Sequence, residues 1–184
     1  MVYTFKLLFK EFEIMRYNIL KKFSFLFFAL ALSISFVSCE KVESVPDESD
    51  IVAKDMMGSW YVEFLVDGED IYHLGFTKIN TYNTSVNDGT SMWIDDNEHT
   101  WTFKVNCPIN SSDQTFSGTG LYSNVGGYEV DVDIINGMIT KDGVTSPSGQ
   151  TTDKIDFEVE FSDDPGTIYQ IVGYRYTGLV GDLP

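Results

Sequence analysis

The chain has 184 residues, which suits one domain with a core of its own. Its net charge of −16 and the lack of a basic patch exclude nucleic acid as a partner, because no surface would meet the phosphates. Only two cysteines are present, Cys39 and Cys107, so a domain built on a disulfide framework is excluded as well.

The first part of the chain has the layout of a bacterial export signal. Between residues 15 and 39, a basic start leads into an apolar run of about 14 residues, which is shorter than a membrane-spanning helix needs. A small residue then precedes Cys39, and this resembles the lipobox in which the cysteine receives diacylglycerol and becomes the mature N-terminus. We expect residues 1–39 to be a lipoprotein signal peptide, with Met15 as an alternative start. The other interpretation is an ordinary secretory signal with a cysteine nearby.

A polar tether follows the signal. Residues 40–50 contain one proline and no apolar period, which is typical of a flexible linker. Acidic residues outnumber basic ones by 26 to 7 beyond Cys39, so acyl chains rather than attraction to anionic headgroups must provide the anchor. Acidic residues just after a lipid cysteine resemble the export signals of surface-exposed lipoproteins in Bacteroidetes. We expect a lipid-anchored protein of the bacterial outer membrane, on its periplasmic or cell-surface face.

Short runs of alternating apolar and polar residues fill the remaining domain, 51–184. A short helix is expected at 50–57, because Gly58 can stop it there. Asn136-Gly137 is expected to form a type I′ hairpin turn, since both residue types tolerate positive φ. The alternating runs cover residues 59–67, 71–79, 91–94, 99–107, 115–123, 128–135, 138–144, 154–161 and 168–178.

This pattern predicts an all-β fold, an antiparallel up-and-down β-barrel of about eight strands with a short N-terminal helix. The strands do not alternate with helices, which argues against a parallel α/β sheet. A meander with one apolar face must bury that face, either by closing into a barrel or by packing as a sandwich. A barrel of about eight strands has room for side chains or for one small ligand.

The start of the first strand resembles the lipocalin, or calycin, signature. Gly58-Ser59-Trp60 follows the expected short helix, and Arg175 is the one arginine beyond Cys39. The resemblance implies that Trp60 plugs the closed end of the barrel with Arg175 packed over its ring, a favourable pairing. Arg175 has the opposite parity from the residues taken as inward-facing, so contact would need the barrel end or a bulge. The alternative for Arg175 is an ion pair with a surface carboxylate.

A wider set of short motifs resembles a family of small Bacteroidetes lipoproteins called lipid-binding putative hydrolases, to which a calycin-like barrel is assigned. The resemblance implies binding of a small lipophilic molecule and membrane attachment through the lipid anchor. The motifs occur in order over nearly the whole domain: 81–85 (TYNTS), 92–96 (MWIDD), Asn136-Gly137, 153–155 (DKI) and 174–178 (YRYTG).

The inward face of such a barrel would line a ligand cavity with apolar and aromatic side chains. The same side chains would equally fill a solid core, and a tethered barrel that presents loops to a glycan or protein is the alternative function. Exposed Tyr61 or Trp93 would favour that alternative. The candidate interior residues are Phe64, Val66, Phe76, Trp101, Phe103, Val130, Val132, Phe157, Val159 and Tyr174.

Catalytic and metal-binding patterns are not visible in the sequence. The nucleophile motif Gly-x-Ser-x-Gly is absent, and the two histidines, His73 and His99, have no partner implied by spacing. The acidic turns 95–98 and 163–164 lack the ligand spacing of a calcium loop. We expect no catalytic residue, no metal and no cofactor. Cys107 is interpreted as a small buried residue, with a reactive thiol as the alternative.

Overall fold

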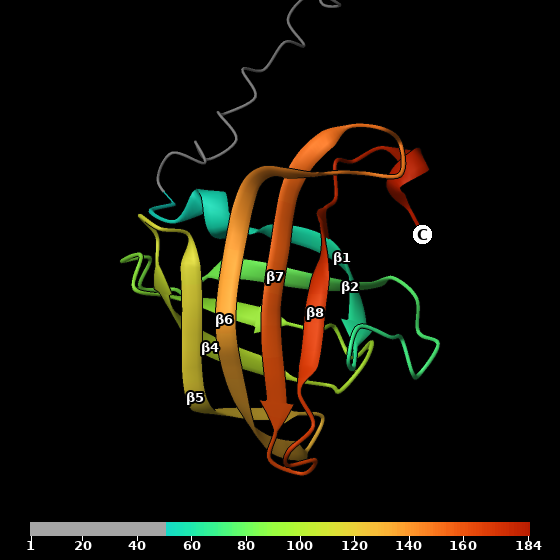
Figure 1. Cartoon of the computed structure of the whole chain (residues 1–184). Helices are drawn as coiled ribbons and strands as arrows, with labels where there is room; N and C mark the ends of the chain where they lie inside the picture. The colour runs from blue at the N-terminus through green and yellow to red at the C-terminus, as the bar shows by residue number, and fades with distance from the viewer. Residues whose placement is uncertain (1–50) are drawn as a thin grey trace, which may run out of the picture. The chain divides into compact units, whose positions relative to one another are not determined.

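The computed structural model describes residues 51–184, which form eight antiparallel strands closed into a barrel (Figure 1). Each strand pairs with its neighbours in chain order, and β1 also pairs with β8, which confirms the up-and-down barrel. The strands are β1 (Gly58–Leu65), β2 (Thr77–Asn83), β3 (Ser91–Asp95), β4 (Lys104–Asn110), β5 (Thr115–Val125), β6 (Tyr128–Thr145), β7 (Thr151–Phe161) and β8 (Tyr169–Arg175).

Two single turns of 3-10 helix flank the barrel, η2 (Lys54–Met56) and η3 (Val180–Asp182). Where a helix over 50–57 is expected, the described residues form only the three-residue η2. No helix of the part that the structure describes is long and apolar enough to cross a membrane. The predicted signal peptide, tether and Cys39 lie outside the described residues.

The Asn136-Gly137 pair does not turn the chain, so the hairpin prediction is wrong. β6 runs through it as one long strand, and the pair forms a bulge in which Asn136 has a φ of 52°. A Cβ on Gly137 would lie 2.4 Å from the ring of Phe116, so only glycine lets β5 and β6 approach here. An Asn-Gly pair whose asparagine has a positive φ therefore marks a bulge as readily as a hairpin turn.

The strand expected over 71–79 begins only at Thr77. Residues 66–76 form a connection that a bridge between Val66 and Glu69 holds at its start. The carboxylate of Asp70 accepts hydrogen bonds from the backbone N–H groups of Leu74 and Gly75, at 3.1 and 2.8 Å. These bonds, that of Gly75 above all, lower the pKa of Asp70. The connection is therefore an ordered loop rather than a continuation of the sheet.

The alternation of the strands sorts side chains into a filled interior and an acidic exterior. Along β7 the inward positions are buried, whereas Asp156, Glu158 and Glu160 lie outside. The antiparallel meander gives the barrel two ends. The open end carries the connections 66–76, 96–103, 126–127 and 162–168. The closed end carries η2, η3 and the connections 84–90, 111–114 and 146–150.

Candidate functional site

Trp60 and Arg175 meet at the closed end, inside the barrel. Their backbones are direct partners in the β1–β8 ladder, so both side chains fall on the inner face, and the guanidinium carbon lies 4.7 Å from the indole centroid. The expectation that Arg175 faces outward, opposite in parity to the inward residues of its strand, is therefore wrong. Trp60 is fully buried, and its Nε1 donates to Thr81 Oγ1 at 2.9 Å. The hydroxyl of Thr81 donates in turn to Met56 O at 2.7 Å.

Arg175 also makes the ion pair that is the alternative expectation. Its Nε lies 3.0 Å from Asp153 Oδ2, while Nη1 and Nη2 donate to Met57 O at 2.8 Å and Asp55 O at 2.5 Å. The guanidinium therefore ties η2 and β7 to the indole at once. The hydrogen bonds and the ion pair of Arg175 therefore close this end of the barrel between η2 and β7.

Tyr174 and Phe76 do not face the interior, which corrects the sequence prediction for both. Tyr174 pairs with Tyr61 on the outer face of the β1–β8 ladder and is buried there against Phe76, at 5.3 Å between ring centroids. Its hydroxyl donates to Asp182 O at 2.9 Å in η3. Burial of Tyr174 therefore comes from loop and C-terminal residues that cover the sheet from outside.

The other interior candidates lie on the inner face or next to it. Val66 and Trp101 pack against the core from the open end and remain partly exposed. The strand residues pack together with their neighbours on the inner face of the barrel. The fully enclosed candidates are Phe64, Phe103, Val130, Val132, Phe157 and Val159.

Four aromatic side chains cover the open end, and we call them the aromatic cluster: Tyr72, Trp101, Phe161 and Tyr169. The indole of Trp101 stacks on Phe161 at 4.8 Å and an interplanar angle of 7°, and lies 4.9 Å from Tyr169. Tyr72 reaches over from the β1–β2 connection, 6.2 Å from Trp101, with its hydroxyl 3.2 Å from that of Tyr169. Phe161 and Tyr169 are fully buried in this cluster, whereas Trp101 and Tyr72 remain partly exposed above them.

Asp96 holds the β3–β4 connection that presents Trp101. Its side chain is 1 % exposed and accepts six hydrogen bonds, all from the seven residues that follow it. The N–H of Trp101 itself is one donor, at 3.0 Å. An acidic turn of this composition is ordinarily solvated, and the residue types alone do not show that the loop folds back over the carboxylate. The donors are the backbone N–H groups of Glu98, Thr100, Trp101, Thr102 and Phe103, with the hydroxyl of Thr100.

Two carboxylates of the β7–β8 connection bind the polar edges of the aromatic residues. Trp101 Nε1 donates to Asp163 at 3.3 Å, and the hydroxyl of Tyr128 donates to the same carboxylate. The hydroxyl of Tyr169 donates to Asp164 at 2.5 Å. Burial together with the hydrogen bond to Asp163 raises the pKa of Tyr128 to about 12, and burial also raises the pKa of Tyr169. Both phenols are therefore neutral at any physiological pH.

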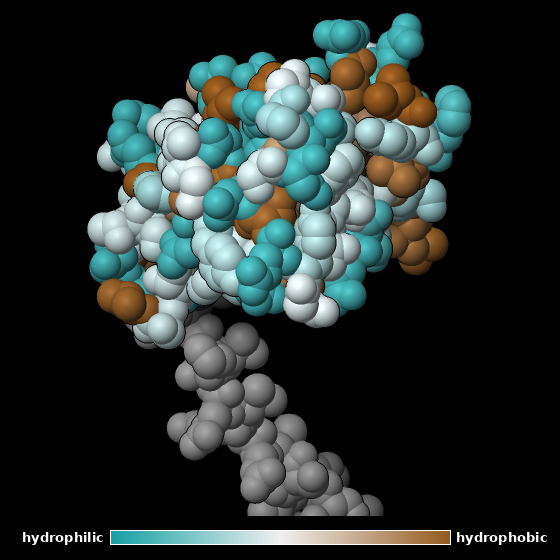
Figure 2. Space-filling model, turned by 90° about the horizontal axis from the view of Figure 1, so that it is seen from below, coloured by the Kyte–Doolittle hydropathy of each residue, from teal (hydrophilic) through white to brown (hydrophobic). Residues whose placement is uncertain are grey.

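Hollows lie on both sides of Trp101. One of about 310 Å³ has Phe64 as its floor, and the next, about 400 Å³, is shared with Tyr128 and Asp163. Exposed apolar side chains border them on the β1–β2 connection, and Figure 2 shows hydrophobic side chains gathered at the edge on that side of the molecule. These exposed residues are Ile71, Tyr72, Leu74 and Phe76. The open end therefore combines space, aromatic faces and apolar borders, as small-molecule sites do.

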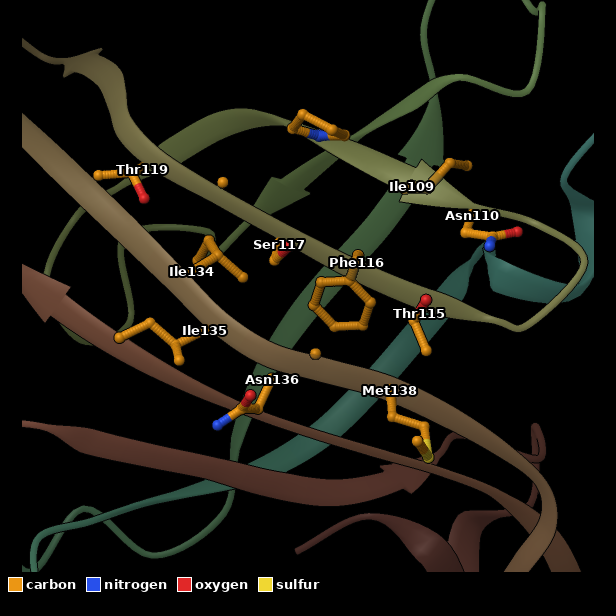
Figure 3. Close-up of a pocket in the computed structure, with 13 residues that line it drawn as sticks. Ile109, Asn110, Thr115, Phe116, Ser117, Thr119, Ile134, Ile135, Asn136 and Met138 are labelled. Atoms are coloured by element: carbon orange, nitrogen blue, oxygen red, sulfur yellow. The ribbon is translucent and has the colours of Figure 1, made fainter.

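A larger groove of about 750 Å³ lies on the wall of the barrel, where bulges interrupt the pairing of β5 with β6 (Figure 3). Its labelled side chains come from β4, β5 and β6, with the ring of Phe116 at the centre. Small polar side chains such as Ser117, Thr119 and Asn136 make up much of its lining. Its one aromatic ring, that of Phe116, is 3 % exposed, whereas Trp101 and Tyr72 are partly exposed at the open end, so we take the open end as the candidate site.

A comparison with known protein families matches residues 45–180 to the family described as lipid-binding putative hydrolase. The chain belongs to this family. A comparison with curated proteins finds no match. Membership in a lipid-binding family agrees with a closed barrel that carries an apolar and aromatic open end, and it confirms the family that the short motifs of the sequence indicate.

The hydrolase part of the family description calls for a nucleophile. Cys107 lies buried in the core, and burial raises its pKa to about 12, so the thiol stays protonated. His99 Nδ1 lies 2.8 Å from the backbone oxygen of Lys78, and His73 lies in the exposed β1–β2 connection. Residues 51–184 contain no group of three His, Cys, Asp or Glu side chains placed to hold a metal. The geometry of the described residues supports binding better than it supports hydrolysis.

Proposed function

We propose that this member of the lipid-binding family is a membrane-anchored lipoprotein that binds a small lipophilic molecule non-covalently at the open end of its barrel. The observation that carries the proposal is the aromatic cluster, in which the partly exposed rings of Trp101 and Tyr72 border hollows above the buried Phe161 and Tyr169. Burial of apolar ligand surface against these rings supplies the driving force. Trp101 is the central contact, because both hollows share it.

The filled interior supports one other function. A solid core is what a tethered interaction module with no internal ligand would have, and such a module would present its loops to a glycan or protein. Tyr61 and Trp93, whose exposure would favour that function, are both half-buried. The amino group of Lys104 covers the ring of Trp93, 5.3 Å from the centroid. Ligand binding at the open end is therefore the better-supported proposal.

Native mass spectrometry of the full chain, recovered from its own host, tests the ligand. We expect a non-covalently bound lipophilic molecule on the unaltered protein and at least about a tenfold lower occupancy in Trp101→Ala, because burial against one large aromatic side chain contributes roughly 1.5–3 kcal/mol. Met138→Ala, which truncates an exposed side chain of the wall groove, is the control and should leave occupancy unchanged. A ligand-free protein, or a Trp101→Ala variant that keeps its ligand, would refute the proposal and favour the interaction module.

The anchor is proposed on Cys39, with residues 40–50 as the tether, at the bacterial outer membrane. What supports it is the order of basic start, apolar run, small residue and cysteine in the sequence. Growth with a radiolabelled fatty acid should label the full chain and leave a Cys39→Ser variant unlabelled, while Cys107→Ser keeps its label. If the Cys39→Ser variant kept its label, the acyl chains would be attached at another residue and the proposed anchor on Cys39 would be wrong.

A further inference from the structure

The charge of the open end is of one sign. Its four connections contain no lysine or arginine, and His73 and His99 are the only side chains there that can become cationic. The field at this end is therefore negative, and a ligand bound at the aromatic cluster lies within it. The acidic residues of these connections are Asp67, Glu69, Asp70, Asp96, Glu98, Asp163 and Asp164.

The lysines nearest to the open end do not offset this charge. Lys104, the first residue of β4, lies 3.5 Å from Asp95 and over the ring of Trp93 on the outer wall. Lys78 of β2 alternates with the buried Ile79 and pairs with Tyr61, so it too faces outward. An anionic headgroup at the aromatic cluster would meet carboxylates and no partner of opposite charge.

The rings themselves are suited to a cation. Trp101 and Tyr72 pack edge to face at 6.2 Å between ring centroids, and both remain partly exposed, so each presents ring surface at the smaller hollow. Tyr169 is fully buried behind them. Tryptophan and tyrosine faces attract cations, and groups of them recognise alkylated ammonium ions.

We propose that the open end selects lipophilic molecules that carry a cationic nitrogen, such as an ammonium group on an alkyl chain. The ammonium group lies against the exposed parts of Trp101 and Tyr72, next to the Asp163 carboxylate that binds Trp101 Nε1, and the alkyl chain covers the apolar border formed by Leu74 and Phe64. This assignment of ligand class rests on the proposed function, and it makes a separate claim about charge.

Three water-soluble probes with the same alkyl chain separate the two claims: octyltrimethylammonium, octanol and octanoate. With the full chain kept in solution by a non-ionic amphipol, titration calorimetry should give octyltrimethylammonium about tenfold tighter binding than octanol, and octanoate the weakest. Asp163→Asn should remove most of the preference for the ammonium probe over octanol, a ratio that cancels any general weakening of the site from the altered hydrogen bonds of Trp101 and Tyr128. Asp113→Asn, an exposed aspartate at the closed end, changes the net charge equally and should keep the preference.

The outcomes distinguish the two claims. Equal binding of the three probes, tighter binding of octanoate, or an equal effect of Asp163→Asn and Asp113→Asn would overturn the charge selection and leave the lipophilic site standing. Failure of all three probes to bind would overturn the proposed function and the selection with it.

Discussion

Replacement of Asp96 by alanine should lower the free energy of unfolding by about 3 kcal/mol or more and abolish ligand binding at the open end. The change deprives five backbone N–H groups and one hydroxyl of a single buried acceptor, and each unsatisfied buried donor costs roughly 1–3 kcal/mol before the loop relaxes. The β3–β4 connection then loses the conformation that seats Trp101 on Phe161. Urea unfolding, followed by circular dichroism, measures the first effect, and ligand occupancy measures the second.

Asp88 provides the matched control for Asp96. It also accepts two hydrogen bonds in a tight connection, from the N–H and hydroxyl of Thr90, but it is exposed and water can replace it. Asp88→Ala should cost less than about 1 kcal/mol and leave ligand binding intact. For Asp96→Asn, the loss in the free energy of unfolding should lie between those of the two alanine variants, because the amide keeps one oxygen acceptor while its NH₂ would face N–H donors. Equal losses for Asp96→Ala and Asp88→Ala would mean that the β3–β4 connection does not depend on its buried carboxylate.

The importance of Asp96 was not accessible to sequence reasoning. A run of acidic residues between two strands is usually solvated, and its composition does not distinguish a solvated turn from one that folds over its own carboxylate. What decides between them is the positive φ of Asn97, Glu98 and Thr102, which turns successive N–H groups inward. Asn97 tolerates such a conformation, but Glu98 and Thr102 do not favour it, so the sequence does not predict the loop that positions Trp101.

The barrel can be predicted from the sequence because the alternation of apolar and polar residues along each strand is a local, periodic pattern. Alternation along β1, β6 and β7 identifies the buried face of each strand, and the need to bury that face predicts closure. Register is where the prediction failed. Parity in β8 was assigned from the large side chain of Tyr174, yet Gly173 is the inward residue, where the β1 backbone passes so close that a Cβ would lie 1.9 Å from Tyr61 O.

That one-residue error explains both mistakes about β8. A shift by one residue moves every side chain of a strand to the other face, so the sequence pattern predicts Tyr174 inward and Arg175 outward, the reverse of what the structure shows. Gly173 has no side chain that could mark the inward face of β8. Tyr174 indicates the wrong face, because Phe76 and η3 bury it from outside the sheet. Pairing of Trp60 with Arg175 followed from the family signature and not from periodicity.

Truncation of Trp60 should be among the costliest single changes to the closed end. Trp60→Ala removes the largest fully buried side chain, leaves a cavity, and leaves Thr81 and the guanidinium of Arg175 without their partner, so we expect a loss of about 3–5 kcal/mol in the free energy of unfolding. Chemical denaturation of the full chain, with the unaltered protein alongside, provides the measurement.

Trp93 is the matched control for Trp60, because it is the same residue type, half-buried on the outer wall under Lys104. Trp93→Ala should cost less than half as much, since solvent replaces the lost contacts and no cavity forms. Ligand binding should survive both changes in whatever fraction remains folded, because the aromatic cluster lies at the opposite end of the barrel. A loss below about 1 kcal/mol for Trp60→Ala would mean that η2 and Arg175 close this end without the indole. Loss of ligand from folded Trp60→Ala protein would instead mean that the two ends are coupled through the packed core.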